Sequence, residues 1–239
     1  MTEKTKAIIT LIGVAIAYVL FVNAIHFLPM FLLISNDFFA PTSPLFEFCA
    51  STSNFMMALS MAIFVFALLK VINTGKKCTN GKFNYDFDKF FYVALALGVL
   101  KTSDVFIFSH LSYWETRNIA DLIISEMISI VVFSIISELF YRHWTITFLE
   151  KHNFQPKTTC IISVIMYYAI NNLHLLLPSK LFWGSVLLET LYFIASGIIL
   201  YQLYTKTRDV RYCIIMQIII ASTGAVITAF KSFMLPHVY

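Results

Sequence analysis

The chain has 239 residues, of which 59% are apolar and only 13% are charged, and its formal net charge is +4. Roughly a quarter of the residues of a soluble domain are charged, so this composition excludes an ordinary soluble enzyme. The apolar residues form runs of about 20, long enough for a helix to cross the ~30 Å hydrocarbon layer. We therefore predict an all-α, polytopic transmembrane helical bundle, a single membrane domain over residues 1–239 whose first partner is the lipid bilayer.

Seven apolar segments are long enough to be transmembrane spans. In chain order they lie at about residues 7–29, 52–72, 90–110, 120–148, 159–177, 184–204 and 211–232. The first segment is too long for the core of a signal peptide, and no small-x-small cleavage site ends it, so we expect an uncleaved first span. Residues 29–35 either lengthen this span or form a separate re-entrant piece, which leaves a count of eight open.

The basic residues predict the orientation of these spans. With the N-terminus inside, the inner segments hold twelve lysine and arginine residues and the outer segments hold three. Cytoplasmic loops of membrane proteins carry an excess of basic residues. We therefore predict a multi-pass protein of the cell membrane with a cytoplasmic N-terminus and an outward C-terminus. This bias accounts for the net positive charge, and no nucleic acid partner is expected.

Four consecutive predicted spans each carry polar or small side chains along one helical face, because residues three or four apart lie on the same side of a helix. The stripes are Ser134–Glu138–Arg142, Tyr167–Asn171–His174, Glu189–Tyr192–Ser196 and Gln217–Ala221–Gly224. A charge at the middle of the bilayer costs roughly 2.5–3.5 kcal/mol, so we expect the stripes to face a shared interior. Glu138 and Arg142 are expected to pair. Such an interior either only holds the helices together or also performs chemistry.

The order of these residues resembles the CAAX protease and bacteriocin-processing (CPBP, or Abi) family of intramembrane proteases. That family has EExxxR on one helix, FxxxH on the next and HxxxN on a late helix. Here 137-SELFYR-142 stands at the first motif and 170-INNLH-174 at the second. Gln217 and Ala221 stand at the histidine and asparagine of the third. The resemblance covers about residues 120–225 and implies an intramembrane endopeptidase.

This chain departs from the family pattern at positions that carry the chemistry. In the family, the first glutamate and the second-motif histidine are thought to activate a water molecule. Ser137 stands in place of that glutamate, and a serine cannot act as a general base without help from another group. Ala221 offers no donor to a developing oxyanion. The resemblance leaves a candidate catalytic pair of Glu138 and His174, although pairing with Arg142 would make Glu138 a poorer proton acceptor. The residues expected to support this candidate catalytic pair are Arg142, Ser137, Asn171 and Gln217.

No metal or other cofactor is expected. Catalytic zinc takes three protein ligands and a water, and the matched positions supply one histidine and one carboxylate. The cysteines have no CxxC spacing, so they suggest neither a zinc site nor a disulfide framework. They are Cys49, Cys78, Cys160 and Cys213.

The resemblance implies peptide cleavage, bacteriocin self-immunity or a non-catalytic binding role. We favour a degenerate member with lost or weakened catalysis that acts in self-immunity or as a membrane scaffold, with a peptide or membrane protein as partner. Thirteen lysines against four arginines would suit a low-GC bacterium. The alternative is an active endopeptidase that cleaves membrane-associated peptides with Glu138 and His174. A third hypothesis, a small transporter, predicts internal repeats or broken helices, and the sequence shows neither.

Overall fold

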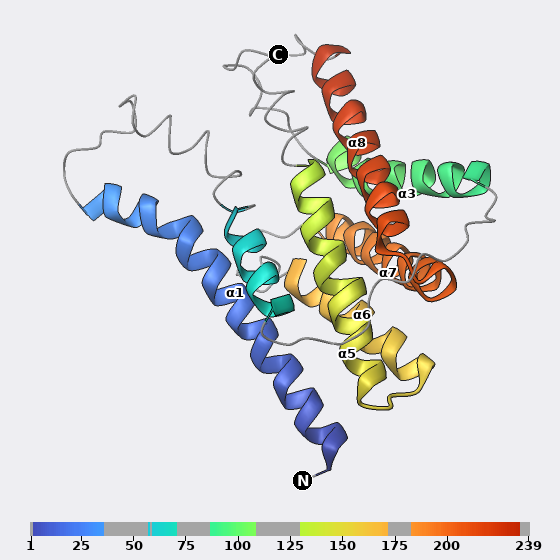
Figure 1. The fold of residues 1–239 in the computed structure, drawn as a ribbon. Helices are drawn as coiled ribbons and strands as arrows, with labels where there is room; N and C mark the ends of the chain where they lie inside the picture. The colour runs from blue at the N-terminus through green and yellow to red at the C-terminus, as the bar shows by residue number, and fades with distance from the viewer. Residues whose placement is uncertain are drawn as a thin grey trace. The chain divides into compact units, whose positions relative to one another are not determined.

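A computed structural model describes residues 2–35, 57, 59–70, 87–108, 130–171 and 183–234. Within these ranges every regular element is helical, which confirms the all-α prediction (Figure 1). Three of the described helices are long and apolar enough to cross a membrane, at Glu3–Ala24, Val186–Thr207 and Val210–Ile227. They identify a multi-pass membrane protein, while the count of seven or eight spans stays a prediction.

The chain forms two compact units, Met1–Gly75 and Lys76–Tyr239. The first contains α1 (Glu3–Ser35) and a shorter apolar helix over Leu59–Lys70. The ring of Tyr18 on α1 meets the ring of Phe64 edge to face, with 5.3 Å between their centroids. Because α1 is one continuous helix, residues 29–35 lengthen the first helix and do not form a separate re-entrant piece.

The second unit carries the remaining helices. They are α3 (Phe87–Phe108), a helical stretch over 130–138 that continues into the π-helix η1 (Leu139–Trp144) and α5 (Thr145–Lys151), then α6 (Pro156–Asn171), α7 (Trp183–Thr207) and α8 (Val210–Met234). Helix α3 packs on α7 and α8, and α6 packs on α5 and α7. The π-helix η1 contacts α6, α7 and α8, so it lies at the centre of this unit.

A tight turn joins α5 to α6. Asn153 adopts the left-handed conformation, with φ of 57°, which asparagine tolerates better than most residues. The N–H groups of Asn153 and Phe154 donate to the carbonyls of Glu150 and Leu149 at 3.0 and 3.2 Å. These bonds are the Schellman pairing that ends a helix. Pro156 then begins α6, where its missing N–H costs nothing, so α6 folds back along α5.

A second tight turn, built from different residues, joins α7 to α8. Arg208 has φ of 54°, and its N–H donates to the carbonyl of Tyr204 at 2.7 Å. The next residue, Asp209, accepts the N–H of Arg211 at 3.0 Å through Oδ1. An aspartate that accepts the N–H of the second helical residue is a favoured start for a helix. Asp209 also pairs with the guanidinium of Arg211.

Glycines allow α3 and α8 to cross closely. A Cβ added at Gly98 would lie 2.6 Å from the Cβ of Thr223, and one added at Gly224 would lie 3.0 Å from Cγ2 of Thr102. Small residues permit such approach between transmembrane helices. The contact confirms that the face of Gly224 allows a neighbouring helix to come close.

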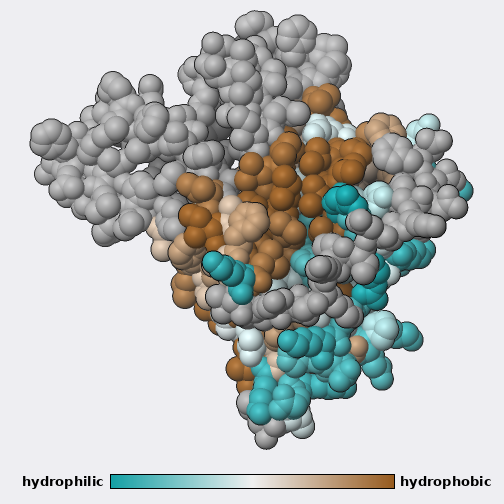
Figure 2. Space-filling model, in the orientation of Figure 1, coloured by the Kyte–Doolittle hydropathy of each residue, from teal (hydrophilic) through white to brown (hydrophobic). Residues whose placement is uncertain are grey.

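Large apolar side chains are exposed along the second unit, among them Ile161, Ile165, Leu187 and Val226. Figure 2 shows hydrophobic residues over the middle of the face in view and hydrophilic residues gathered toward one end. Apolar surface of this extent is avoided by soluble monomers. The bilayer is therefore the environment that these side chains meet.

Candidate functional site

The candidate site lies where the central helix changes its hydrogen-bond spacing. In η1, Leu139–Trp144, each turn contains an extra residue. The backbone N–H of Thr145 donates to the carbonyl of Phe140, five residues earlier, and the Thr145 hydroxyl donates to the same oxygen at 2.9 Å. Glu138 immediately precedes the π turn and Arg142 lies inside it. Single π turns in proteins are often found at functional sites.

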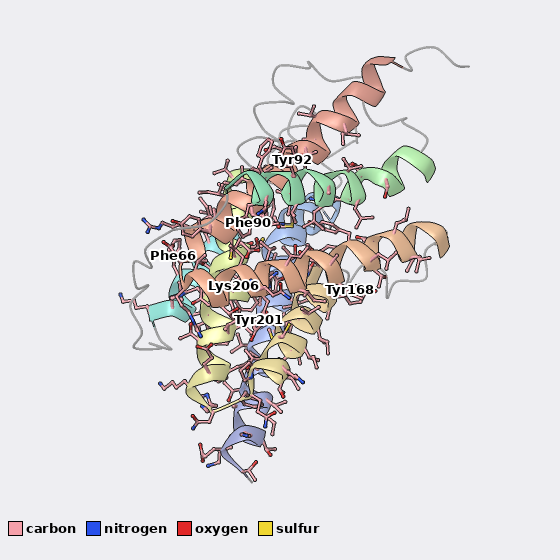
Figure 3. The ribbon with its side chains drawn as sticks, turned by 90° about the vertical axis from the view of Figure 1, so that its right-hand side faces the viewer. Phe66, Phe90, Tyr92, Tyr168, Tyr201 and Lys206 are labelled. Carbon is pink, nitrogen blue, oxygen red and sulfur yellow. The ribbon has the colours of Figure 1, made fainter. Side chains whose placement is uncertain are left out.

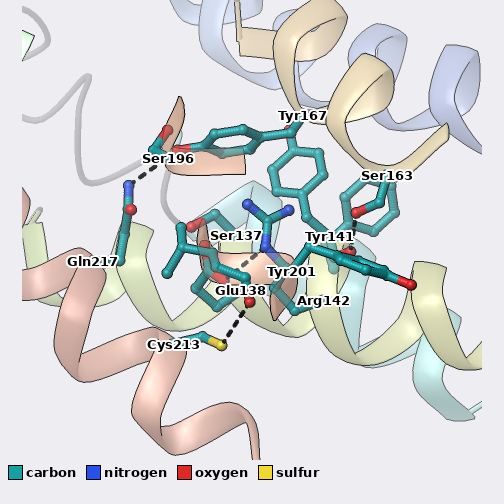
Figure 4. A network of polar contacts seen from close by, with 12 residues as sticks. Ser137, Glu138, Tyr141, Arg142, Ser163, Tyr167, Ser196, Tyr201, Cys213 and Gln217 are labelled. Carbon is teal, nitrogen blue, oxygen red and sulfur yellow. Dashed lines mark hydrogen bonds and ion pairs between the residues drawn. The ribbon is translucent and has the colours of Figure 1, made fainter. Parts of the chain in front are cut away.

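Glu138 and Arg142 form the ion pair that their spacing predicts. Arg142 Nε lies 3.4 Å from Glu138 Oε2, and both side chains are 0% exposed (Figure 4). The separation is too long for a good N–H···O hydrogen bond, and neither side chain has a hydrogen-bond partner among the described residues. Instead, the guanidinium carbon lies 4.7 Å from the ring centroid of Tyr167. The electrons of that ring face stabilise the cation.

Two tyrosines connect this pair to the other predicted polar residues. Gln217 Nε2 donates to the Tyr167 hydroxyl at 3.3 Å. The Tyr141 ring lies edge-on to that of Tyr167, and Asn171 Nδ2 donates to the Tyr141 hydroxyl at 3.2 Å. Ser163 donates to the Tyr141 carbonyl at 3.3 Å. Polar stripes from the central helix, α6 and α8 therefore meet, as predicted.

The other predicted site residues do not all join this group of polar side chains. The hydroxyl of Ser137 donates to the carbonyl of Ser134 at 3.3 Å, within its own helix. From the stripe on α7, Tyr192 and Ser196 are buried. His174 lies outside the described residues, so its pairing with Glu138 stays a prediction. In the part of the chain that the structure describes, no three His, Cys, Asp or Glu side chains are grouped as metal ligands would be.

A second polar stripe, on α5 and the end of η1, escaped the sequence analysis. His143 Nδ1 and Thr147 Oγ1 lie 3.2 and 3.3 Å from the Tyr204 hydroxyl. Arg208 Nη1 donates to both carboxylate oxygens of Glu150 at 2.8 Å. Positions 143, 147 and 150 share one helical face, and this spacing was the available signal. The stripe fixes α5 to α7, so it holds the helix that carries the candidate site.

Part of the chain matches a known protein family. Residues 120–223 match the family model described as type II CAAX prenyl endopeptidase Rce1-like. This segment contains η1, α5, α6, α7 and most of α8. A search of curated proteins found no match, and a search of solved structures found none either. The resemblance expected from the motifs is thus confirmed: over residues 120–223 this chain matches the Rce1-like type II CAAX prenyl endopeptidases of the CPBP family.

Proposed function

We propose that this protein is a CPBP-family membrane protein with lost or weakened catalysis, which acts by binding a peptide or membrane-protein partner in bacteriocin self-immunity or as a scaffold. One observation carries the proposal. Glu138, the glutamate that remains at the first family motif, is wholly buried with its carboxylate against Arg142.

This placement suits structural support better than proton transfer. A general base must come within hydrogen-bonding reach of the water proton that it removes. Glu138 has no exposed surface, and its carboxylate lies 3.4 Å from the Arg142 guanidinium. Ser137, at the position of the family's first glutamate, directs its hydroxyl to a carbonyl of its own helix. Neither residue presents a free carboxylate to a water molecule.

The half of the family site that would stabilise an oxyanion is also altered. Gln217 keeps a side-chain amide, but one of its N–H groups is directed to the Tyr167 hydroxyl. Ala221 has no donor at all. Loss of one oxyanion donor lowers enzymatic rates by roughly 10²–10³. The substitutions on both sides of the site therefore support a role in binding.

The proposal is tested by complementation. A strain that lacks the protein is challenged with antimicrobial peptides made by the same or related strains, and protection is restored with the wild-type chain. We expect Glu138→Gln and His174→Ala to protect as well as the wild type once protection is normalised to membrane abundance, which Glu138→Gln should lower because it leaves Arg142 buried without its anion. Loss of protection by both variants, with normal abundance, would instead support an endopeptidase that uses these residues.

A further inference from the structure

The central helix carries two polar stripes that a regular α-helix would turn to different sides. The first ends with Glu138 and Arg142, and the second consists of His143, Thr147 and Glu150. An α-helix turns by about 100° per residue. The residues of the second stripe follow Glu138 by five, nine and twelve positions, so an unbroken α-helix would turn them roughly 120–180° away from it. One stripe would then face the interior of the bundle and the other would face away from it.

In the structure, both stripes meet helices that pack on each other. Arg142 lies against the Tyr167 ring of α6, whereas Thr147 reaches the Tyr204 hydroxyl of α7. Because α6 and α7 are in contact, the two stripes face the same side of the central helix. The π turn accounts for this arrangement. It adds one residue to a turn, so the residues of the second stripe beyond it lag by about 100° and come to lie roughly 20–80° from Glu138.

Two hydroxyl groups supply hydrogen bonds that favour the π turn. In an α-helix, the N–H of Thr145 would donate to the carbonyl of Tyr141, four residues earlier. Here it donates to the carbonyl of Phe140, and the Thr145 hydroxyl donates to the same oxygen at 2.9 Å. The carbonyl of Tyr141 instead accepts the Ser163 hydroxyl of α6 at 3.3 Å (Figure 4). Thr145 and Ser163 are both 0% exposed, so bulk water does not supply these bonds.

Helix α6, which carries Ser163, is joined to α7 near both of its ends. The Tyr201 hydroxyl of α7 donates to the carbonyl of Pro156, the first residue of α6, at 2.8 Å. Toward the other end, the Tyr168 hydroxyl lies 3.2 Å from Oγ1 of Thr190 on α7. Figure 3 shows both tyrosines along these neighbouring helices. Ser163 lies between the two contacts in the sequence, so α7 fixes the helix that donates to η1.

We propose that the extra residue of η1 is a register device that turns both polar stripes of the central helix toward α6 and α7, and that Thr145 and Ser163 are the positioning residues that hold it. A stripe turned away from these helices would lose its partners and leave buried polar groups without hydrogen bonds, which is costly. This role is the same whether the interior binds a peptide or cleaves one, so it does not rest on the function proposed above.

Deletion of Leu139 tests the register. This half-buried residue lies in η1, and its deletion should convert the π turn to an α turn while the helix on both sides keeps its register. Membrane abundance and unfolding temperature in detergent should therefore stay close to those of Leu139→Ala, which loses only the side chain. The control deletes Leu191, 48% exposed in the regular helix α7. That deletion rotates one part of α7 by about 100° against the other and should abolish accumulation in the membrane. Equal loss in the two deletions would overturn the proposal.

A double-mutant cycle tests the positioning residues. In the full chain, Ser163→Ala should lower the unfolding temperature by about 2–4 °C, the shift expected for one lost hydrogen bond at this chain length. In the Leu139 deletion, the N–H of Thr145 is free to bond to the carbonyl of Tyr141, so Ser163→Ala should have little effect there. Thr145→Val should show the same dependence on the background. Equal shifts in both backgrounds would make these hydroxyls ordinary packing contacts and overturn their positioning role.

Discussion

Arg142 faces Glu138 at 3.4 Å on one side and the ring of Tyr167 at 4.7 Å on the other, with no exposed surface on either member of the ion pair. Removal of charges from water is costly, and a buried pair offsets that cost only while both partners are present. The contact between Arg142 and the Tyr167 ring joins the central helix to α6. The members of the ion pair are expected to be far less tolerant of single substitution than of replacement together.

Arg142→Ala should destabilise the protein by roughly 3–5 kcal/mol, because it leaves Glu138 buried without its cation. The double variant Glu138→Gln/Arg142→Met removes both charges at similar volume and should cost much less. Thermal unfolding of the purified proteins in detergent, together with abundance in the membrane, measures the difference. If the single variant were as stable as the double one, the pair would not have the structural role assigned to it.

The ring of Tyr167 contacts Arg142 and its hydroxyl accepts a bond from Gln217, and two substitutions separate these contacts. Tyr167→Phe keeps the ring beside Arg142 and loses the hydroxyl that Gln217 donates to. It should cost about 1 kcal/mol, a typical value for one hydrogen bond. Tyr167→Leu also loses the interaction of the ring with the cation, so it should cost a further ~0.5–2 kcal/mol. Equal unfolding temperatures for the two variants would show that the ring does not stabilise Arg142.

Arg208 combines a strained backbone with a partly exposed ion pair. Its left-handed conformation, with φ of 54°, costs an ordinary residue about 1–2 kcal/mol. Its pair with Glu150 is 46% exposed on the arginine side, so this pair contributes at most about 1 kcal/mol. Both Arg208→Gly and Arg208→Ala lose the pair, but only glycine relieves the strain. We expect the glycine variant to unfold at a higher temperature than the alanine variant, and the reverse order would contradict this account of the turn.

The turn between α7 and α8 should also make stability depend on acidity. Hydrogen bonds from the Arg211 guanidinium hold the pKa of Asp209 below its ordinary value. The folded protein therefore binds fewer protons at this carboxylate than the unfolded chain does, and the stabilisation is lost as pH falls through the lowered pKa. Asp209→Asn keeps a good helix-capping side chain but cannot titrate.

Unfolding temperatures measured from pH 7 to pH 3 check this prediction. The wild type should lose stability more steeply than the Asp209→Asn variant at the acid end of the range. Arg211→Gln, which keeps the aspartate but removes the cation, should reduce the slope in the same direction. Identical acid profiles for all three proteins would remove Asp209 as a source of pH dependence.

The ion pair and the meeting of polar stripes were predictable because they follow from spacing and from the cost of exposing polar groups to lipid. Glu138 and Arg142 are four residues apart, and the helix itself brings them together. The π turn was not predictable. Its residues contact α6, α7 and α8, and these contacts join residues that are distant in sequence.

The positions at which the helices end were also not predictable from hydropathy. The predicted spans stop at 148 and 204, whereas α5 continues to Lys151 and α7 to Thr207. Hydropathy marks where a helix leaves the lipid, but the helix ends where its last carbonyls are satisfied. The left-handed residues Asn153 and Arg208 provide those ends. The contact between Glu150 and Arg208 lies in these additional turns, which is one reason why the sequence analysis missed it.

The most direct test of the central claim is a cleavage assay with the purified full-length protein in lipid nanodiscs. The substrates are prenylated CAAX-type peptides and a library of unmodified membrane-associated peptides, and an active family member serves as positive control. We predict that the wild-type chain gives no cleavage above buffer. Cleavage by the wild type that disappears in both Glu138→Gln and His174→Ala would contradict the account, because the buried carboxylate would then act as a catalyst.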